Sequence, residues 1–128
     1  QIIKVNISTT NINDLLENSD FISIHVPMPK DGKPVIGSEE FKMMKDGVRL
    51  VNAARGGVVD ENALIDAINS GKVSFAALDV FVGEPNPSKD LLLNNKISFT
   101  PHIGAATLEA QDRIGTELAD KIINFYNQ

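Results

Sequence analysis

The sequence contains no cysteine, and this absence excludes several kinds of chemistry. A chain without cysteine can form no disulfide, no thiolate metal site and no thiol nucleophile. Its two histidines, His25 and His102, lie far apart and lack the spacing of a recognisable zinc site, so we expect no metal centre. The absence of cysteine also fits a cytoplasmic protein, which is the location that we expect.

Basic charge and long apolar runs are also scarce. The 12 lysine and arginine residues are outnumbered by 17 aspartate and glutamate residues, which gives a formal net charge of -5. Nucleic-acid binding needs clustered basic residues, so we expect no nucleic-acid partner. No apolar run approaches the length of a membrane span, so we expect no membrane partner either. The hydrophobic fraction of 42% is ordinary for a globular domain with its own core.

Four short apolar segments, rich in β-forming residues, recur along the chain with helical spacing between them. They are segments 21–26, 48–53, 75–81 and 97–100. Near-continuous apolar strands that alternate with helices are typical of a parallel sheet with helices on both faces. The sequence therefore predicts an α/β fold with right-handed crossover connections.

Capping residues predict where the helices begin and end. We expect helices over 12–18, 39–45, 61–70 and 106–126. Ser38 and Asp60 are the predicted N-caps of the second and third helices, because a side-chain oxygen there can accept from the first free N–H groups. Gly47 and Gly71 follow these two helices, where a left-handed residue is favoured.

The last predicted helix is the longest and has an amphipathic pattern. Charged residues fall on the rest of its surface, while apolar residues recur at steps of three and four. This pattern predicts a helix that faces the core of the domain. The apolar stripe consists of Ala110, Ile114, Leu118, Ile122 and Phe125.

An arginine follows the second predicted strand and is the first candidate functional residue. Arg55 precedes Gly56 and Gly57, which permit a close backbone approach. Its guanidinium fork matches a carboxylate through two parallel hydrogen bonds. The alternative is an exposed arginine that simply pairs with an acidic side chain at the surface.

Two acidic residues are associated with the third predicted strand. Asp79 interrupts an apolar run, and a buried carboxylate needs a partner. It could accept hydrogen bonds from a carboxamide, or it could be a structural turn residue. Glu84 precedes Pro85 in the loop after this strand, and is either a solvated loop acid or the orienting partner of a histidine.

The two histidines differ in their sequence surroundings. His102 follows the fourth predicted strand and precedes the longest helix. A histidine beside a carboxylate is the usual general acid and base, because the carboxylate fixes the tautomer and stabilises the imidazolium. The alternative for His102 is a structural histidine. His25 has no acidic residue close to it in sequence, so we interpret it as structural, lining a cleft at most.

Taken together, these segments resemble the successive signatures of the D-2-hydroxyacid dehydrogenase family. The matching segments are 20–27, 52–60, 77–85 and 100–105, in the family's order. The resemblance implies a Rossmann-type NAD-binding domain, and an enzyme that transfers hydride between nicotinamide and a D-2-hydroxy acid. Segment 109–115 resembles the phosphoglycerate dehydrogenase branch, which implies oxidation of 3-phospho-D-glycerate in serine biosynthesis.

The resemblance also implies roles for individual residues. Arg55 would bind the carboxylate and carbonyl of the substrate, His102 would donate and accept the proton, and Glu84 would be its partner. Asp79 would meet the nicotinamide carboxamide or ribose. NAD is the implied cofactor, a small 2-hydroxy acid the implied ligand, and a homodimer the implied assembly. The residues implied to contact the cofactor are Ala53, Ala54, Arg55, Asp79, His102, Ile103, Gly104 and Ala105.

The chain departs from the family's pattern in what it lacks. None of its nine glycines forms the Gly-x-Gly-x-x-Gly loop, and the chain enters the strand-like segment 2–5 directly after Gln1. We therefore expect residues 1–128 to be a partial NAD-binding domain, inactive alone, without the glycine-loop half and the substrate domain. The alternatives are a glyoxylate or hydroxypyruvate reductase, or an NAD-sensing corepressor-like binding protein on the same scaffold.

Overall fold

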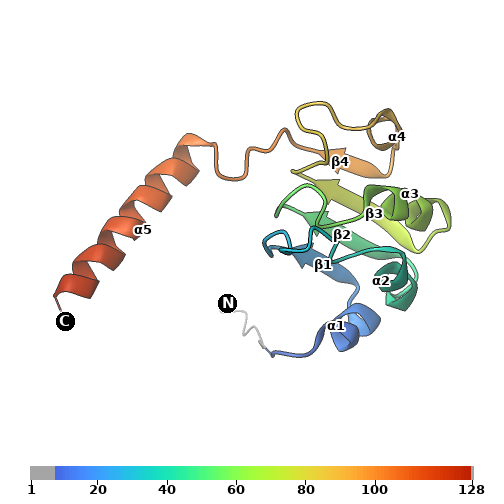
Figure 1. Ribbon diagram of the computed structural model, residues 1–128, viewed down its shortest axis with the longest axis horizontal. Helices are drawn as coiled ribbons and strands as arrows, with labels where there is room; N and C mark the ends of the chain where they lie inside the picture. Colours follow the sequence, from blue (N-terminus) through green and yellow to red (C-terminus); the bar gives the residue numbers. More distant parts are fainter. Residues whose placement is uncertain (1–7, 128) are drawn as a thin grey trace, which may run out of the picture.

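A four-stranded parallel sheet forms the centre of the chain in the computed structural model, which describes residues 8–127. The strands pair in the order β1-β2-β3-β4, so each is hydrogen-bonded to the next in sequence (Figure 1). The predicted parallel α/β sheet is confirmed, whereas segment 2–5 lies outside the described residues. The strands are β1 (Phe21–Ile24), β2 (Val48–Asn52), β3 (Val73–Leu78) and β4 (Ile97–Phe99).

Five helices accompany the sheet within the described residues. The predicted helix over 12–18 is confirmed at both ends, and three others begin or end within two residues of their predicted bounds. The short fourth helix was not predicted, because a single turn shows no apolar period. The helices are α1 (Ile12–Asn18), α2 (Ser38–Met43), α3 (Glu61–Asn69), α4 (Lys89–Leu92) and α5 (Leu108–Tyr126).

The caps of α2 and α3 show how local chemistry fixes the two helix starts. Asp60 caps α3 as predicted, and its side chain accepts a hydrogen bond from the backbone N–H of Ala63 at 3.0 Å. The prediction for α2 is wrong by one residue, because Ser38 is already helical and Gly37 is the N-cap. The Glu40 carboxylate accepts from the Gly37 N–H at 2.8 Å, which moves the start of the helix.

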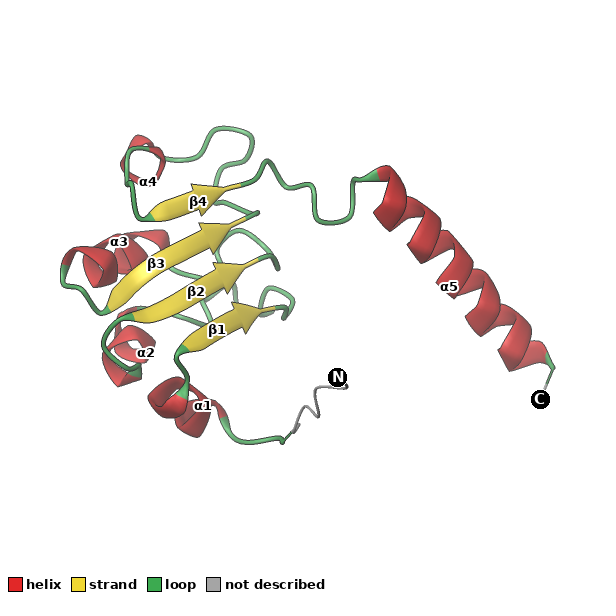
Figure 2. Cartoon of the chain, turned by 180° about the vertical axis from the view of Figure 1, so that it is seen from behind, coloured by secondary structure: helices red, strands yellow, loops and turns green. Residues whose placement is uncertain are grey.

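Helices α1 to α4 lie on one face of the sheet, so the predicted cover on both faces is not present within residues 8–127 (Figure 2). Residues along β1 and β2 alternate between buried and exposed. Right-handed crossovers that always step to the next strand place every connecting helix on the same side. The open face carries exposed apolar residues, namely Phe21, Val51 and Phe75.

The core between the sheet and α3 anchors the loop that follows β2. Leu50, Leu64 and Ile68 are each at most 1% exposed. The loop is also tied by an isolated parallel bridge between Ile36 and Val59. The segment that carries Arg55 is therefore fixed at both ends, which sets the position of its side chain.

The last helix is formed as predicted but does not face the core. Thr107 caps α5 by accepting from the N–H of Ala110 at 3.1 Å. No residue of α5 is buried, and Ile114, Leu118 and Ile122 are each at least half exposed. The expected core-facing position is thus wrong for this chain, since α5 extends away from the sheet (Figure 1). None of the helices within residues 8–127, α5 included, combines the length and apolarity needed to cross a bilayer.

Candidate active site

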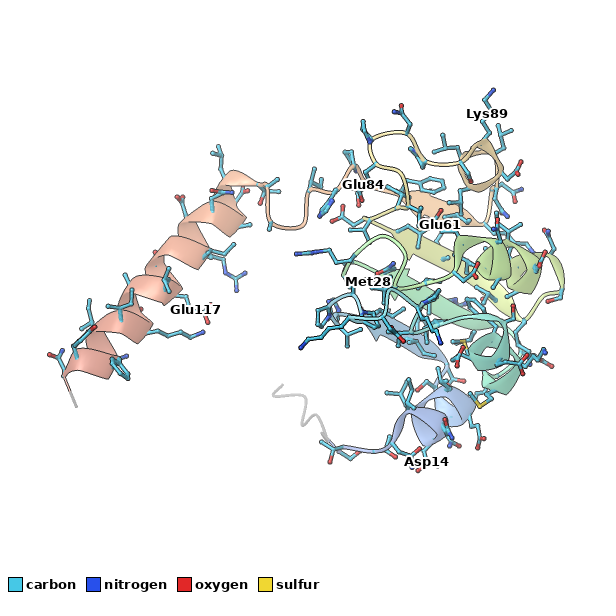
Figure 3. The ribbon with its side chains drawn as sticks, viewed as in Figure 1. Asp14, Met28, Glu61, Glu84, Lys89 and Glu117 are labelled. Atoms are coloured by element: carbon cyan, nitrogen blue, oxygen red, sulfur yellow. The ribbon has the colours of Figure 1, made fainter. Side chains whose placement is uncertain are left out.

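The carboxyl ends of the strands form one edge of the sheet, and a hollow of about 690 Å³ opens there. In open parallel sheets this edge is where ligands bind. Met28 and Glu84, which are labelled in Figure 3, both line this hollow. The three predicted catalytic residues are brought together here, since Arg55, Glu84 and His102 share the lining with Ala53, Ala54 and His25.

His102 and Glu84 form a direct pair. The Nδ1 atom of His102 lies 2.7 Å from Oε2 of Glu84. An ionised carboxylate can only accept, so Nδ1 carries the proton and Nε2 is left to accept another. The hydrogen bond from His102, aided by one from the Phe81 N–H, holds the pKa of Glu84 below its ordinary value. The predicted pairing is therefore present in the structure.

This pair gives a first testable prediction. We expect His102→Ala to raise the pKa of Glu84 toward its ordinary value of 4.5, because the imidazole is the largest cause of the depression. A carboxylate with a depressed pKa adds stability above that ordinary value and loses it as pH falls through the folded-state pKa. The variant should lose this contribution to stability. The pKa of Glu84 is measured by carboxyl 13C NMR during an acid titration.

The same titration contains an internal control. The pKa of Glu117 on α5 is lowered by a hydrogen bond from Lys121, far from the sheet edge in sequence. It should therefore titrate identically in the parent and variant proteins. A Glu84 titration that does not move in His102→Ala would show that the pair is not formed in solution.

Asp79 organises the loop that carries His102. Its carboxylate accepts from the Thr100 hydroxyl at 2.6 Å and from the N–H groups of Ile103 and Gly104, both at 2.9 Å. Burial acts to raise the pKa of Asp79, but these hydrogen bonds outweigh it and the pKa is lowered. His102 has φ 55, a left-handed conformation that is uncommon outside glycine. The Asp79 bonds on both sides of His102 hold it there.

Arg55 has no carboxylate partner among the residues that the structure describes. Its Nη1 donates only to the carbonyl of Ala54, at 2.6 Å. Asn52 fixes the turn beneath it, because its side chain accepts from the Ala54 N–H and donates to the Arg55 carbonyl. Arg55 is thus presented to the hollow rather than paired at the surface, in line with the first of the two interpretations of the sequence.

Two residues in this part of the site were missed from the sequence. Asn52 is 2% exposed in the structure. An asparagine at the end of an apolar strand is the sequence signal that could have marked it as a turn organiser. Glu61, the first residue of α3, accepts from the Val82 N–H at 2.6 Å. No sequence pattern indicates this contact, because it joins the start of α3 to a loop residue 21 positions further along the chain.

Gly56 permits a close backbone approach, but to the protein itself. A Cβ built at Gly56 would lie 1.9 Å from the carbonyl oxygen of Phe81, so only glycine fits. Gly57 has φ 84, which also favours glycine. The glycine pair therefore lets the Arg55 segment pack directly on the loop that leads to Glu84.

His25 lines the hollow and has no carboxylate partner in the described part of the chain. Its Nε2 lies 2.7 Å from the Ser23 hydroxyl. This agrees with its interpretation as a residue that lines the cleft. Within residues 8–127, no three histidine, aspartate or glutamate side chains are grouped to hold a metal ion.

The residues expected to contact a cofactor lie around two adjoining hollows. The second has a volume of about 290 Å³ and shares Ala53 with the first; its lining includes Asp79, Ile103 and Gly104. Small residues beside polar groups suit a flat, polar ring such as nicotinamide. Ala105 lines neither hollow. The sequence has no glycine loop for a pyrophosphate, so these residues fit only the nicotinamide half of NAD.

A parallel α/β sheet with a histidine–carboxylate pair and a free arginine at its ligand-binding edge has the arrangement of a dehydrogenase nucleotide-binding domain. A family model described as "D-isomer specific 2-hydroxyacid dehydrogenase, NAD binding domain" matches residues 1–104. The chain belongs to this family. The resemblance recognised from the sequence motifs is confirmed, and so is NAD as the family's cofactor.

Individual relatives agree with this assignment. D-3-phosphoglycerate dehydrogenase of Archaeoglobus fulgidus is 47% identical over 94% of this chain, and hydroxypyruvate reductase of Thermotoga maritima is 48% identical over 88%. The chain spans 23% and 38% of these two proteins. A glyoxylate reductase structure from Paecilomyces thermophila matches 84% of this chain and 33% of its own, with 39% identity and TM-score 0.76. The Rossmann-type fold is thereby confirmed.

Proposed function

We propose that residues 1–128 are the catalytic part of the NAD-binding domain of a longer enzyme, which transfers hydride between NAD and a D-2-hydroxy acid. The observation that carries this proposal is the meeting of Arg55, Glu84 and His102 around one hollow. The remainder of the enzyme would supply the glycine-loop half and the substrate domain. That division is supported by the share of the relatives that this chain spans, 23% and 38%.

The chemistry assigns each catalytic residue a step. In the oxidative direction, neutral His102 accepts the C2 hydroxyl proton at Nε2, while Glu84 stabilises the imidazolium that forms. NAD, when bound, supplies the hydride acceptor. In the reductive direction the imidazolium returns the proton to the carbonyl oxygen. A positioned acid and base of this kind contributes roughly 10²–10⁴-fold in rate.

Arg55 would hold the substrate carboxylate and stabilise charge on the reacting oxygen. We expect Arg55→Ala to lower kcat/KM of the full-length enzyme by about 10²-fold, mainly through KM, and Arg55→Lys to recover only part, because lysine lacks the planar fork. Steady-state kinetics measure both. Lys42→Ala, which removes an exposed positive charge on α2, is the control. An unchanged kcat/KM in Arg55→Ala would remove this residue from substrate binding.

The substrate that we propose is 3-phospho-D-glycerate, oxidised to 3-phosphohydroxypyruvate in serine biosynthesis. The phosphoglycerate dehydrogenase of Archaeoglobus fulgidus supports it with 47% identity over 122 residues. Reduction of hydroxypyruvate or glyoxylate is the second candidate, favoured by the 48% identity to the Thermotoga maritima reductase. Parallel assays of NADH formation with 3-phospho-D-glycerate, and of NADH consumption with hydroxypyruvate and glyoxylate, decide between them. Failure of all three substrates would contradict the proposal.

The proposal includes the cofactor contacts, the assembly and the location. NAD would be contacted by the residues around the two hollows and by Ala105, the enzyme would be a homodimer, and its location would be the cytoplasm. The placement of Ala53, Asp79 and Gly104 at one edge supports the cofactor contacts. Calorimetry with NAD and sedimentation of the full-length enzyme test affinity and assembly.

A further inference from the structure

The peptide between Phe81 and Val82 is held from two directions, and the peptide before it from a third. Its N–H group, on Val82, donates to Oε1 of Glu61 at 2.6 Å. Its carbonyl oxygen lies so close to Gly56 that a Cβ there would be only 1.9 Å away. The preceding N–H, on Phe81, donates to Oε1 of Glu84 at 2.8 Å. Two successive peptide units at Phe81 therefore join α3, the Arg55 segment and the Glu84 carboxylate.

We propose that Glu61 is a positioning residue, which holds the Phe81–Glu84 loop against the Arg55 segment. It thereby fixes the position of the Glu84–His102 pair relative to Arg55. This inference rests on the proposed function, because the relative position of these three residues matters for turnover only if they act on the same substrate. Glu61 lines neither of the two hollows. Its effect would be transmitted only through the Val82 N–H and the loop.

The surroundings of Glu61 indicate that it is not an ordinary surface acid. It is half-buried and lies next to Asp60 in sequence; burial and the charge of Asp60 both raise its pKa, against the lowering effect of the Val82 bond. The helix cap is already supplied by Asp60. A half-buried carboxylate beside another acid, whose hydrogen bond reaches from α3 to the Phe81–Glu84 loop, is explained by that bond.

The two hydrogen bonds of the Glu84 carboxylate explain why the Glu61 contact matters for catalysis. One carboxylate oxygen of Glu84 accepts a hydrogen bond from the Phe81 N–H, and the other accepts one from the His102 imidazole. A shift of the Phe81–Val82 peptide therefore moves the carboxylate that orients the imidazole. Displacements of about 1 Å in a catalytic constellation can cost up to roughly 10²-fold in rate.

The test compares Glu61→Met and Glu61→Gln in the full-length enzyme. Methionine keeps the length and helix propensity of the side chain but removes the acceptor, while glutamine keeps a neutral acceptor. We expect Glu61→Met to lower kcat by about 10-fold or more with little change in KM, and Glu61→Gln to recover most of it. The matched control is Glu39→Met, which changes an exposed glutamate in the first turn of α2.

Two readouts separate positioning from mere stabilisation and do not depend on turnover. In Glu61→Met, hydrogen exchange at the Val82 amide should accelerate by at least about 10-fold, and the depressed pKa of Glu84 should move toward its ordinary value. The Leu64 amide, bonded within α3 to the Asp60 carbonyl, should stay protected. Glu61→Gln should restore both signals, which loss of the helix alone would not do.

The outcomes distinguish this inference from the proposed function. If the wild-type enzyme turns over no 2-hydroxy acid, yet Val82 exchange and Glu84 titration respond as expected, the function is wrong and the positioning role of Glu61 stands. If both signals are unchanged in a folded Glu61→Met protein, the inference is overturned. Should Glu61→Met fail to fold, normal kcat with unprotected Val82 in Glu61→Gln would overturn it as well.

Discussion

Replacing His102 with asparagine should lower turnover of the full-length enzyme by at least ~10²-fold while NAD still binds. The expected loss follows from the removal of Nε2, which is the only nitrogen of the ring not engaged by Glu84. Asparagine is the suitable substitution, because it tolerates the left-handed backbone that His102 adopts at φ 55. The Asp79 hydrogen bonds to the neighbouring N–H groups should therefore persist.

Single-turnover kinetics and calorimetry measure the two parts of this prediction separately. His25→Asn is the matched control, since His25 lines the same hollow but bonds to Ser23 rather than to a carboxylate. We expect it to reduce turnover by less than about 10-fold, as it has no partner to stabilise an imidazolium. Near-normal turnover in His102→Asn would remove His102 from the mechanism, and equal losses in both variants would point to a general disturbance of the hollow.

The features that could be predicted from the sequence are those governed by short-range rules. The short apolar runs placed all four strands close to their observed positions, and Asp60 and Gly71 marked the two ends of α3. The meeting of Glu84 and His102 could be predicted because parallel strands place their carboxyl ends at one edge. The motif resemblance then connected that edge with a known chemistry.

The features that could not be predicted depend on contacts between segments distant in sequence, or on which surface an apolar face packs against. Asn52 and Glu61 act on loop backbone whose position follows only from the folded sheet. The stripe on α5 has the same period whether the helix covers this chain's core or another surface, so its exposed position carried no sequence signal. The prediction of helices on both faces of the sheet was wrong for the same reason, since apolar strands do not reveal which segment covers them.

Gly56→Ala should be the most destabilising of the small substitutions near the site. The added Cβ would lie 1.9 Å from the carbonyl oxygen and 2.4 Å from the carbonyl carbon of Phe81, and backbone atoms cannot rotate away as a side chain can. Overpacking of this kind typically costs about 1–3 kcal/mol, and more where backbone must move. We therefore expect a lower urea midpoint with an unchanged m-value in the full-length enzyme.

The same substitution should also impair catalysis beyond its effect on stability. To admit the new methyl group, the Arg55 segment must separate from the Phe81–Val82 peptide, which moves Arg55 away from the Glu84–His102 pair. Gly115→Ala is the control, because nothing lies within 4 Å of a Cβ at that exposed position of α5. In a helix alanine is favoured over glycine by roughly 1 kcal/mol, so this variant should be slightly stabilised. Equal midpoints for Gly56→Ala and the parent protein would mean that the two loops do not meet as closely as the structure shows.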